Sequence, residues 1–108
     1  MSDGSGSISE ARVWEALGSV LDPELGIDVV SLGLVYEVRL DRATVHLSLT
    51  LTTIGCPLQE ELEQQARAAV GAVEGVEEVH LAWTFEPPWT PDRLTEEGRD
   101  ALIAMGLL

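Results

Sequence analysis

The chain has 108 residues, the length of one domain, and 45% of them are hydrophobic, which is enough to form a core. Nineteen acidic residues stand against six arginines, with no lysine, so the net charge is −13. This charge repels phosphate backbones and anionic lipids, and no run of about 18 apolar residues occurs, so we expect neither a nucleic acid nor a membrane as partner.

The N-terminus and the single cysteine indicate where the protein resides. Residues 1–8 show no signal-peptide pattern and are predicted to be a flexible segment before a single domain over residues 9–108. One cysteine excludes an internal disulfide and fits a reducing compartment. We therefore expect a cytoplasmic protein.

One helix and a turn are predicted after the flexible segment. The helix should begin after the N-cap Ser9 and end at Leu21 or Asp22, because Pro23 disfavours helical geometry in the residue before it. Residues 22–28 then form a turn or loop. The apolar face of the helix comprises Val13, Leu17, Val20 and Leu21.

The middle of the chain is predicted to form a hairpin, a helix and a third strand. Alternating apolar and polar residues predict strands over 34–40 and 44–51, joined as an antiparallel hairpin. Apolar residues at helical spacing predict a second helix over 58–73, and alternation returns in a strand over 79–83. The expected fold is α+β, a two-layer sandwich ordered helix-strand-strand-helix-strand, with two helices covering one face of a three-stranded sheet.

The opposite face of this sheet is expected to be more open and to carry threonine and histidine. His46 and His80 fall at polar positions of their strands, so they could be neighbours. We interpret them as exposed side chains rather than a metal-binding pair, because no further ligand stands at suitable spacing. A catalytic dyad of Cys56 with a histidine has weak support, since His46 points from the middle of its strand.

The C-terminal part is predicted to hold an extended arm and a short helix. Residues 85–91 contain three prolines, which exclude a central strand or a helix interior. The helix is expected from the N-cap Thr95 to Met105, with Gly106 as its stop. Two interpretations of Trp89 in the arm stay open: it packs against the domain, or it anchors another chain.

Cys56 is the strongest candidate functional residue. It stands where the strand pattern ends and the second helical pattern begins, and Pro57 suits the first helical position. Unpaired backbone N–H groups and the helix dipole at such a junction favour the thiolate, which attacks electrophiles and binds soft metals. The alternative is a small buried side chain, since free cysteine is often buried.

Two carboxylates could converge on the same place. Asp22 and Glu24 stand on either side of a proline in the turn after the first helix. That turn and the loop before the second helix could meet at one end of the sheet, close to Cys56, Thr52 and Thr53. A carboxylate raises the pKa of a nearby thiol unless something such as a metal is bound between them, so a mixed thiolate and carboxylate site is a hypothesis. The alternative is ordinary turn chemistry.

Three separated segments stand out together: DPELGIDVVSLGLVY (22–36), TTIGCP (52–57) and WTFEPPWTPDRLTEEG (83–98). In this order they resemble the metal–sulfur cluster assembly factor family, and the similarity extends over about residues 9–107. Its members include SufT-type factors, the PaaD protein of phenylacetate degradation and the eukaryotic cytosolic iron–sulfur targeting factors. The resemblance implies a fold similar to the C-terminal domain of NifU-type scaffolds and a role in maturing iron–sulfur proteins, not an enzymatic one.

The resemblance also implies roles for individual residues. The reactive cysteine of the family corresponds to Cys56, which would contact iron or a transient iron–sulfur cluster. A cluster normally takes four protein ligands, so a partner protein, a small thiol or a second copy would supply the others, and a homodimer stays open. The expected partners are the iron–sulfur scaffold and client apo-proteins. Supporting roles are expected for Asp22, Glu24, Thr52, Thr53 and Gly55.

Three other functions are weighed against this one. An adaptor would bind clients and scaffold through the acidic surface and through Pro87, Pro88 and Trp89, without touching a cluster. A PaaD-like accessory role for a multicomponent oxygenase has less support, because PaaD-type members carry an extra cysteine-rich C-terminal segment. A cysteine-dependent hydrolase or transferase has the least support, because neither a general base nor an oxyanion pocket is evident in the sequence.

Overall fold

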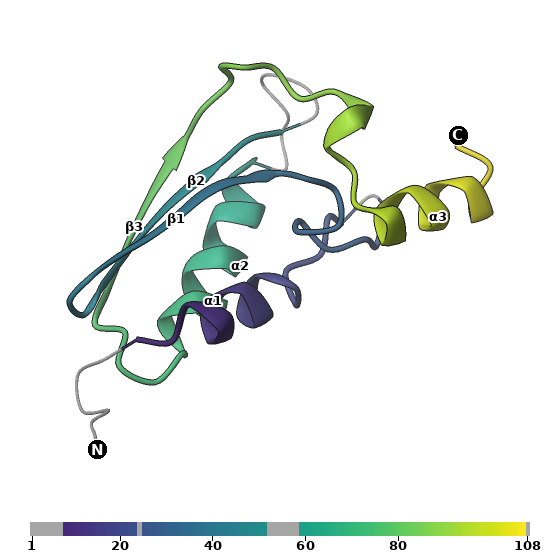
Figure 1. The fold of residues 1–108 in the computed structure, drawn as a ribbon. Helices are drawn as coiled ribbons and strands as arrows, with labels where there is room; N and C mark the ends of the chain where they lie inside the picture. Colours follow the sequence, from purple (N-terminus) through teal and green to yellow (C-terminus); the bar gives the residue numbers. More distant parts are fainter. Residues whose placement is uncertain (1–7, 24, 52–58, 108) are drawn as a thin grey trace.

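The computed structural model describes residues 8–23, 25–51 and 59–107, and its elements follow the predicted order (Figure 1). Their ends lie within about two residues of the predicted ranges, except at the end of the first helix. The predicted α+β class is confirmed. The elements are α1 (Glu10–Leu17), β1 (Val35–Asp41), β2 (Thr44–Leu49), α2 (Gln59–Gly71), β3 (Glu78–Trp83), the 3₁₀ helix η1 (Pro91–Arg93) and α3 (Glu96–Ala104).

The sheet is mixed, with the strand order β1-β2-β3. Strands β1 and β2 form the predicted antiparallel hairpin, whereas β2 and β3 run parallel and are connected through α2. A register shift between Val35 and Glu37 interrupts the pairing at the start of β1. Across the middle of the sheet the register sets Arg39, His46 and His80 side by side.

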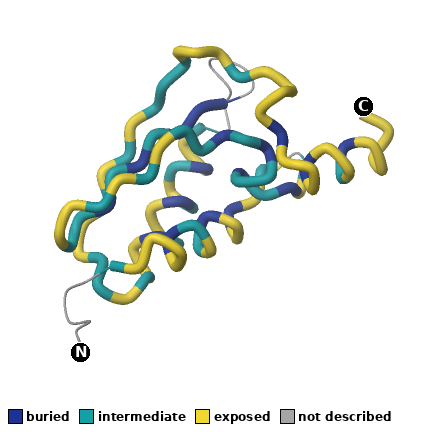
Figure 2. Tube along the Cα trace, in the orientation of Figure 1, coloured by how far each residue is buried: buried dark blue, intermediate teal, exposed yellow. Residues whose placement is uncertain are grey.

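Helices α1 and α2 lie on one side of the sheet, and the core is formed between the two layers (Figure 1). Along β2, burial alternates with the period of two that a half-buried strand requires (Figure 2). Fully burying one such aliphatic side chain contributes about 1.5–3 kcal/mol. In the described part of the chain, no helix has the length and apolar character needed to span a bilayer. The two layers contribute Val45, Leu47 and Leu49 from β2, Val13 and Leu17 from α1, and Leu62, Ala66 and Val70 from α2.

Helix α1 ends at Leu17, earlier than the predicted end at Leu21 or Asp22. Both the hydroxyl and the backbone N–H of Ser19 donate to the carbonyl of Ala16, at 2.6 and 3.0 Å. Local bonds of this kind compete with the next helical turn. The chain then runs extended, so Leu21 is 45% exposed, and its predicted place on the buried helix face is wrong.

Helix α3 begins and ends as predicted and lies at one end of the molecule (Figure 1). The Thr95 hydroxyl accepts a hydrogen bond from the backbone N–H of Gly98 at 3.1 Å, as an N-cap does. At the other end Gly106 has φ 78°, a conformation that favours glycine. The N–H groups of Gly106 and Leu107 donate to the carbonyls of Ile103 and Leu102, which completes a Schellman motif.

Candidate functional site

Much of the predicted site lies outside the described residues. The β2–α2 connection runs from Leu49 to Gln59, and five of the predicted site residues fall in it or in the turn after α1. Their predicted roles therefore stay predictions. Those five residues are Glu24, Thr52, Thr53, Gly55 and Cys56.

Asp22 is described, and it organises the turn after α1. Its Oδ1 accepts a hydrogen bond from the backbone N–H of Leu25 at 3.1 Å, and its carbonyl accepts one from Gly26 at 2.7 Å. Its own N–H donates to the carbonyl of Ile27 at 2.9 Å. These bonds are the turn chemistry expected of aspartate, and they hold the carboxylate at the start of the first motif segment.

The buried hydroxyl of Thr50 was not anticipated from the sequence. Strand alternation places Thr50 on the open face with His46 and Ser48, yet it is only 1% exposed. Its backbone N–H donates to the carbonyl of Leu34 at 2.8 Å, whereas its Oγ1 has no hydrogen-bond partner among the described residues. A buried polar atom without a partner carries a desolvation cost of about 1–3 kcal/mol. The Thr50 hydroxyl can therefore donate or accept a further hydrogen bond, and it lies just after β2 in the part of the chain that leads to Cys56.

The arm folds back onto the segment between α1 and β1, residues 28–36, and Trp89 joins the two. Its Nε1 donates to the carbonyl of the buried Leu32 at 2.7 Å, and the indole is half-buried against the core. The Trp89 ring therefore packs against its own domain, which is one of the two interpretations left open by the sequence. Pro87 and Pro88 are exposed, and the partner-binding role predicted for the arm stays a prediction.

Tyr36 and Arg93 add two further contacts between these segments. The Tyr36 hydroxyl donates to the carbonyl of Pro87 at 2.8 Å, and the Arg93 guanidinium carbon lies 4.1 Å from the centre of the Tyr36 ring, a cation–π geometry. Both residues stand in the motif segments, but the sequence offered no signal that they meet. The two outer motif segments therefore form one unit, which we call the clamp (residues 28–36 with 84–98).

Two glycines allow the clamp to close. A Cβ at Gly33 would lie 2.1 Å from the carbonyl oxygen of Arg93, and a Cβ at Gly98 would lie 2.1 Å from that of Ser31. Gly33 also has φ 72°. The backbone N–H of Thr95 donates to the carbonyl of Ser31 at 3.0 Å beside the second approach. Gly33 and Gly98 thus allow close backbone-to-backbone packing.

The two histidines are neighbours, as the sequence indicated. The ring centres of His46 and His80 are 5.1 Å apart, with the planes inclined at 39°. His80 Nε2 also lies 3.3 Å from Oε2 of Glu78. Within residues 8–23, 25–51 and 59–107, no group of three or more His, Cys, Asp or Glu residues is placed to hold a metal ion.

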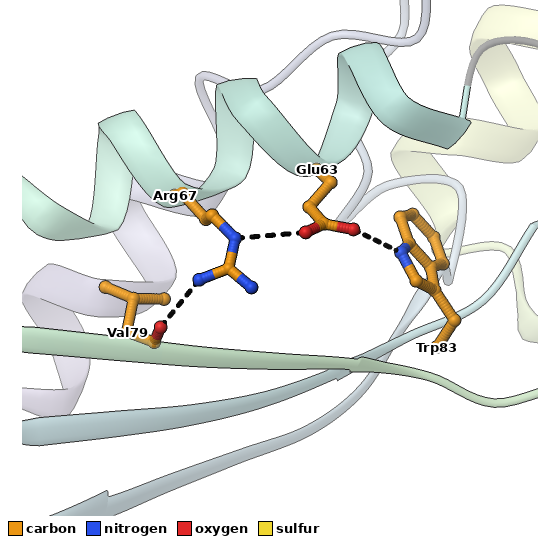
Figure 3. Close-up of polar contacts among 4 residues, drawn as sticks. All are labelled: Glu63, Arg67, Val79 and Trp83. Carbon is orange, nitrogen blue, oxygen red and sulfur yellow. Dashed lines mark hydrogen bonds and ion pairs between the residues drawn. The ribbon is translucent and has the colours of Figure 1, made fainter.

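A polar network joins α2 to the outer strand β3 (Figure 3). Glu63 accepts hydrogen bonds from the Trp83 indole at 2.9 Å and from Arg67 Nε at 3.1 Å, and Arg67 Nη1 donates to the carbonyl of Val79 at 2.7 Å. The Trp83 hydrogen bond is the main cause that lowers the pKa of Glu63. Burial opposes it, and the hydrogen bond and positive charge of Arg67 lower the pKa further. The network ties the strand edge to the helix that follows the predicted site.

We expect Glu63→Gln to change how stability depends on acid. A carboxyl whose pKa is lowered by folding stabilises the fold above its usual value of 4.5, and this is lost as the pH falls through the lowered value. At pH 7 the variant should lose less than about 1 kcal/mol, because the pair is partly exposed and screened by solvent. Urea unfolding measured from pH 7 to pH 3 should show that the free energy of unfolding falls less in Glu63→Gln than in the parent. An unchanged acid dependence would contradict this, and Glu74→Gln, an exposed site, is the control.

Comparison with known families agrees with the resemblance. The family model described as iron-sulfur cluster assembly protein matches residues 10–81. The iron–sulfur protein maturation auxiliary factor YitW of Bacillus subtilis is 43% identical over 99 residues, covering 89% of this chain and 92% of that protein. The maturation auxiliary factor SufT of Staphylococcus aureus is 38% identical over 89 residues, covering 82% and 98%.

A solved structure supports the fold independently. The crystal structure of a domain of unknown function, DUF59, from Bacillus anthracis superposes with a TM-score of 0.82. It is 33% identical, and the match covers 92% of this chain and 92% of that chain. The chain therefore belongs to the iron–sulfur cluster assembly protein family, of the SufT-like kind.

Proposed function

We propose that this protein helps to mature iron–sulfur proteins, as a carrier or targeting factor and not as an enzyme. The observation that carries the proposal is the 43% identity to a maturation auxiliary factor over nearly the full length of both chains. The acidic surface, with its net charge of −13, suits solution and protein partners with basic surfaces. The scaffold and the client apo-proteins are the proposed partners, and the cytoplasm is the proposed location.

Within this function we propose Cys56 as the residue that contacts the cargo. It is the only cysteine, and it stands in the connection between β2 and α2. Iron–sulfur clusters are held by cysteine thiolates and normally need four protein ligands. One thiolate per chain therefore supports brief, shared ligation with a scaffold, a client or a second copy. Cargo held in this way can be passed on.

Neighbouring oxygen atoms are proposed to assist the thiolate. Asp22 and Glu24 could serve as exchangeable ligands, while Thr52 and Thr53 could hydrogen-bond sulfur and Gly55 could allow close backbone approach. The orphaned hydroxyl of Thr50 supports a polar ligand near this end of β2, because a partner there would offset its desolvation.

The proposal is tested by Cys56→Ser in a strain that lacks the native gene. We expect the activity of client iron–sulfur enzymes to fall at least about tenfold, because serine cannot replace a thiolate as a soft ligand. The purified variant should unfold at the same temperature as the parent and still capture client apo-protein. Full client activity with Cys56→Ser would overturn the role of the thiol.

The adaptor interpretation retains one supporting observation, the exposure of Pro87 and Pro88 on the arm. Pro88→Glu is the matched variant, since it changes this surface and leaves Cys56 intact. An adaptor requires loss of client capture in Pro88→Glu together with full maturation by Cys56→Ser. The opposite pattern favours transfer through the thiol.

A further inference from the structure

The open face of the sheet brings two imidazoles together in solvent. His46 on β2 and His80 on β3 are paired in the parallel register, and α1 and α2 lie on the opposite side of the sheet (Figure 1). His46 is half-buried, and the His80 side chain is more than half exposed. The strand pairing fixes the two side chains next to each other, so the pair is formed before any ligand arrives.

The separation of the rings fits two imidazoles bound to one ion. A transition-metal ion lies about 2.0–2.1 Å from an imidazole nitrogen, and therefore about 3.2 Å from the ring centre. Ring centres 5.1 Å apart would then subtend roughly 105° at the ion, close to a tetrahedral angle.

Glu78 supports the same arrangement. Its Oε2 lies 3.3 Å from His80 Nε2, and an ionised carboxylate only accepts hydrogen bonds. A hydrogen bond to this carboxylate requires the tautomer with its proton on Nε2, and in that tautomer the lone pair of the ring is on Nδ1. Histidines that bind metals commonly donate their other N–H to a carboxylate in this way.

We propose that His46 and His80 bind a divalent first-row transition ion such as Zn²⁺, with Glu78 orienting His80 and water completing the coordination. The described residues offer no group of three or more such ligands, so the proposed site has two protein ligands and depends on water for the others. The acidic surface raises the local concentration of cations, whereas Arg39, the register partner of His46, opposes binding. The proposal is independent of Cys56.

The test is calorimetric titration of Zn²⁺ into the full chain carrying Cys56→Ser, which removes the competing thiol. On this background, His46→Ala and His80→Ala should each weaken binding about tenfold or more, because a two-ligand site becomes a single ligand. Glu78→Gln should weaken it about 3- to 10-fold, and Arg39→Gln should tighten it about threefold. Glu77→Gln, with the same charge change in the exposed residue next to Glu78, should change it less than twofold.

Two results would overturn the proposal. Equal Zn²⁺ affinity in the parent and both histidine variants would mean that the acidic surface alone attracts the ion. If only one of the two histidine substitutions weakened Zn²⁺ binding, a single imidazole would bind the ion and the two would not act as a pair. Thermal unfolding of each variant checks the fold, and the Co²⁺ absorption spectrum of the Cys56→Ser protein should show tetrahedral coordination that either histidine substitution abolishes. None of these readouts depends on client maturation, so they leave the proposed function untouched.

Discussion

Gly33→Ala is expected to destabilise the fold by about 3 kcal/mol or more. The added Cβ would lie 2.1 Å from the carbonyl oxygen of Arg93 and 2.6 Å from its carbonyl carbon, and neither backbone atom can move without opening the clamp. The residue also has φ 72°, which costs an alanine about 1–2 kcal/mol by itself. Overpacking adds about 1–3 kcal/mol. Urea unfolding at pH 7 measures the sum.

Gly26→Ala separates these two contributions. Gly26 has φ 69°, almost the same backbone conformation, but a Cβ there meets no atom of the described residues within 4 Å. We therefore expect only the backbone cost of about 1–2 kcal/mol. If both variants lost the same stability, the close approach between Gly33 and Arg93 would not be a feature of the folded protein.

Trp89→Ala is expected to lower the free energy of unfolding by about 3 kcal/mol and the Tm by roughly 10 °C or more. The substitution removes a half-buried indole and leaves the carbonyl of Leu32 without its donor. Because the bond joins residues 57 positions apart, its loss should also free the arm. Limited proteolysis should cut the variant within residues 84–95 sooner than the parent.

Trp14→Ala is the matched control for the indole. Trp14 is also half-buried, but its Nε1 donates to Glu10 within the same helix at 3.2 Å and links no distant segments. We expect a smaller loss of stability and no change in cleavage of the arm. Equal effects of the two substitutions would show that Trp89 contributes only buried area. Trp89→Phe keeps an aromatic ring but lacks the N–H donor, so its free energy of unfolding should lie between those of the parent and Trp89→Ala.

Local patterns were sufficient to predict the elements of this fold. Period-two alternation located all three strands, and the caps Thr95 and Gly106 located α3, because these signals act between residues close in sequence. The predicted end of α1 was wrong, because Ser19 bonds to the carbonyl of Ala16 and the helix stops there. The spacing of apolar residues carries no information about such a bond. The strand order, which the pattern leaves open, is set by pairing between distant segments.

The candidate site was less predictable, because its contacts join residues that are far apart in the sequence. That His46 and His80 could be neighbours followed from their polar strand positions, but their register depends on the parallel pairing of β2 with β3. The contacts of Tyr36 and Trp89 join residues more than 50 positions apart, and no local signal reports such partners. The burial of Thr50 also contradicts its alternation, because tertiary packing overrides the pattern at the end of β2.

The clamp has a consequence for how the protein is made. Leu32 and Trp89, one in each half, are 57 positions apart, and a ribosome adds about 5–20 residues per second. For roughly 3–11 s after Leu32 is synthesised, its carbonyl therefore has no indole to accept from. Residues 28–36 therefore leave the ribosome before their partner does, and the clamp closes only once the tryptophan has also left the exit tunnel.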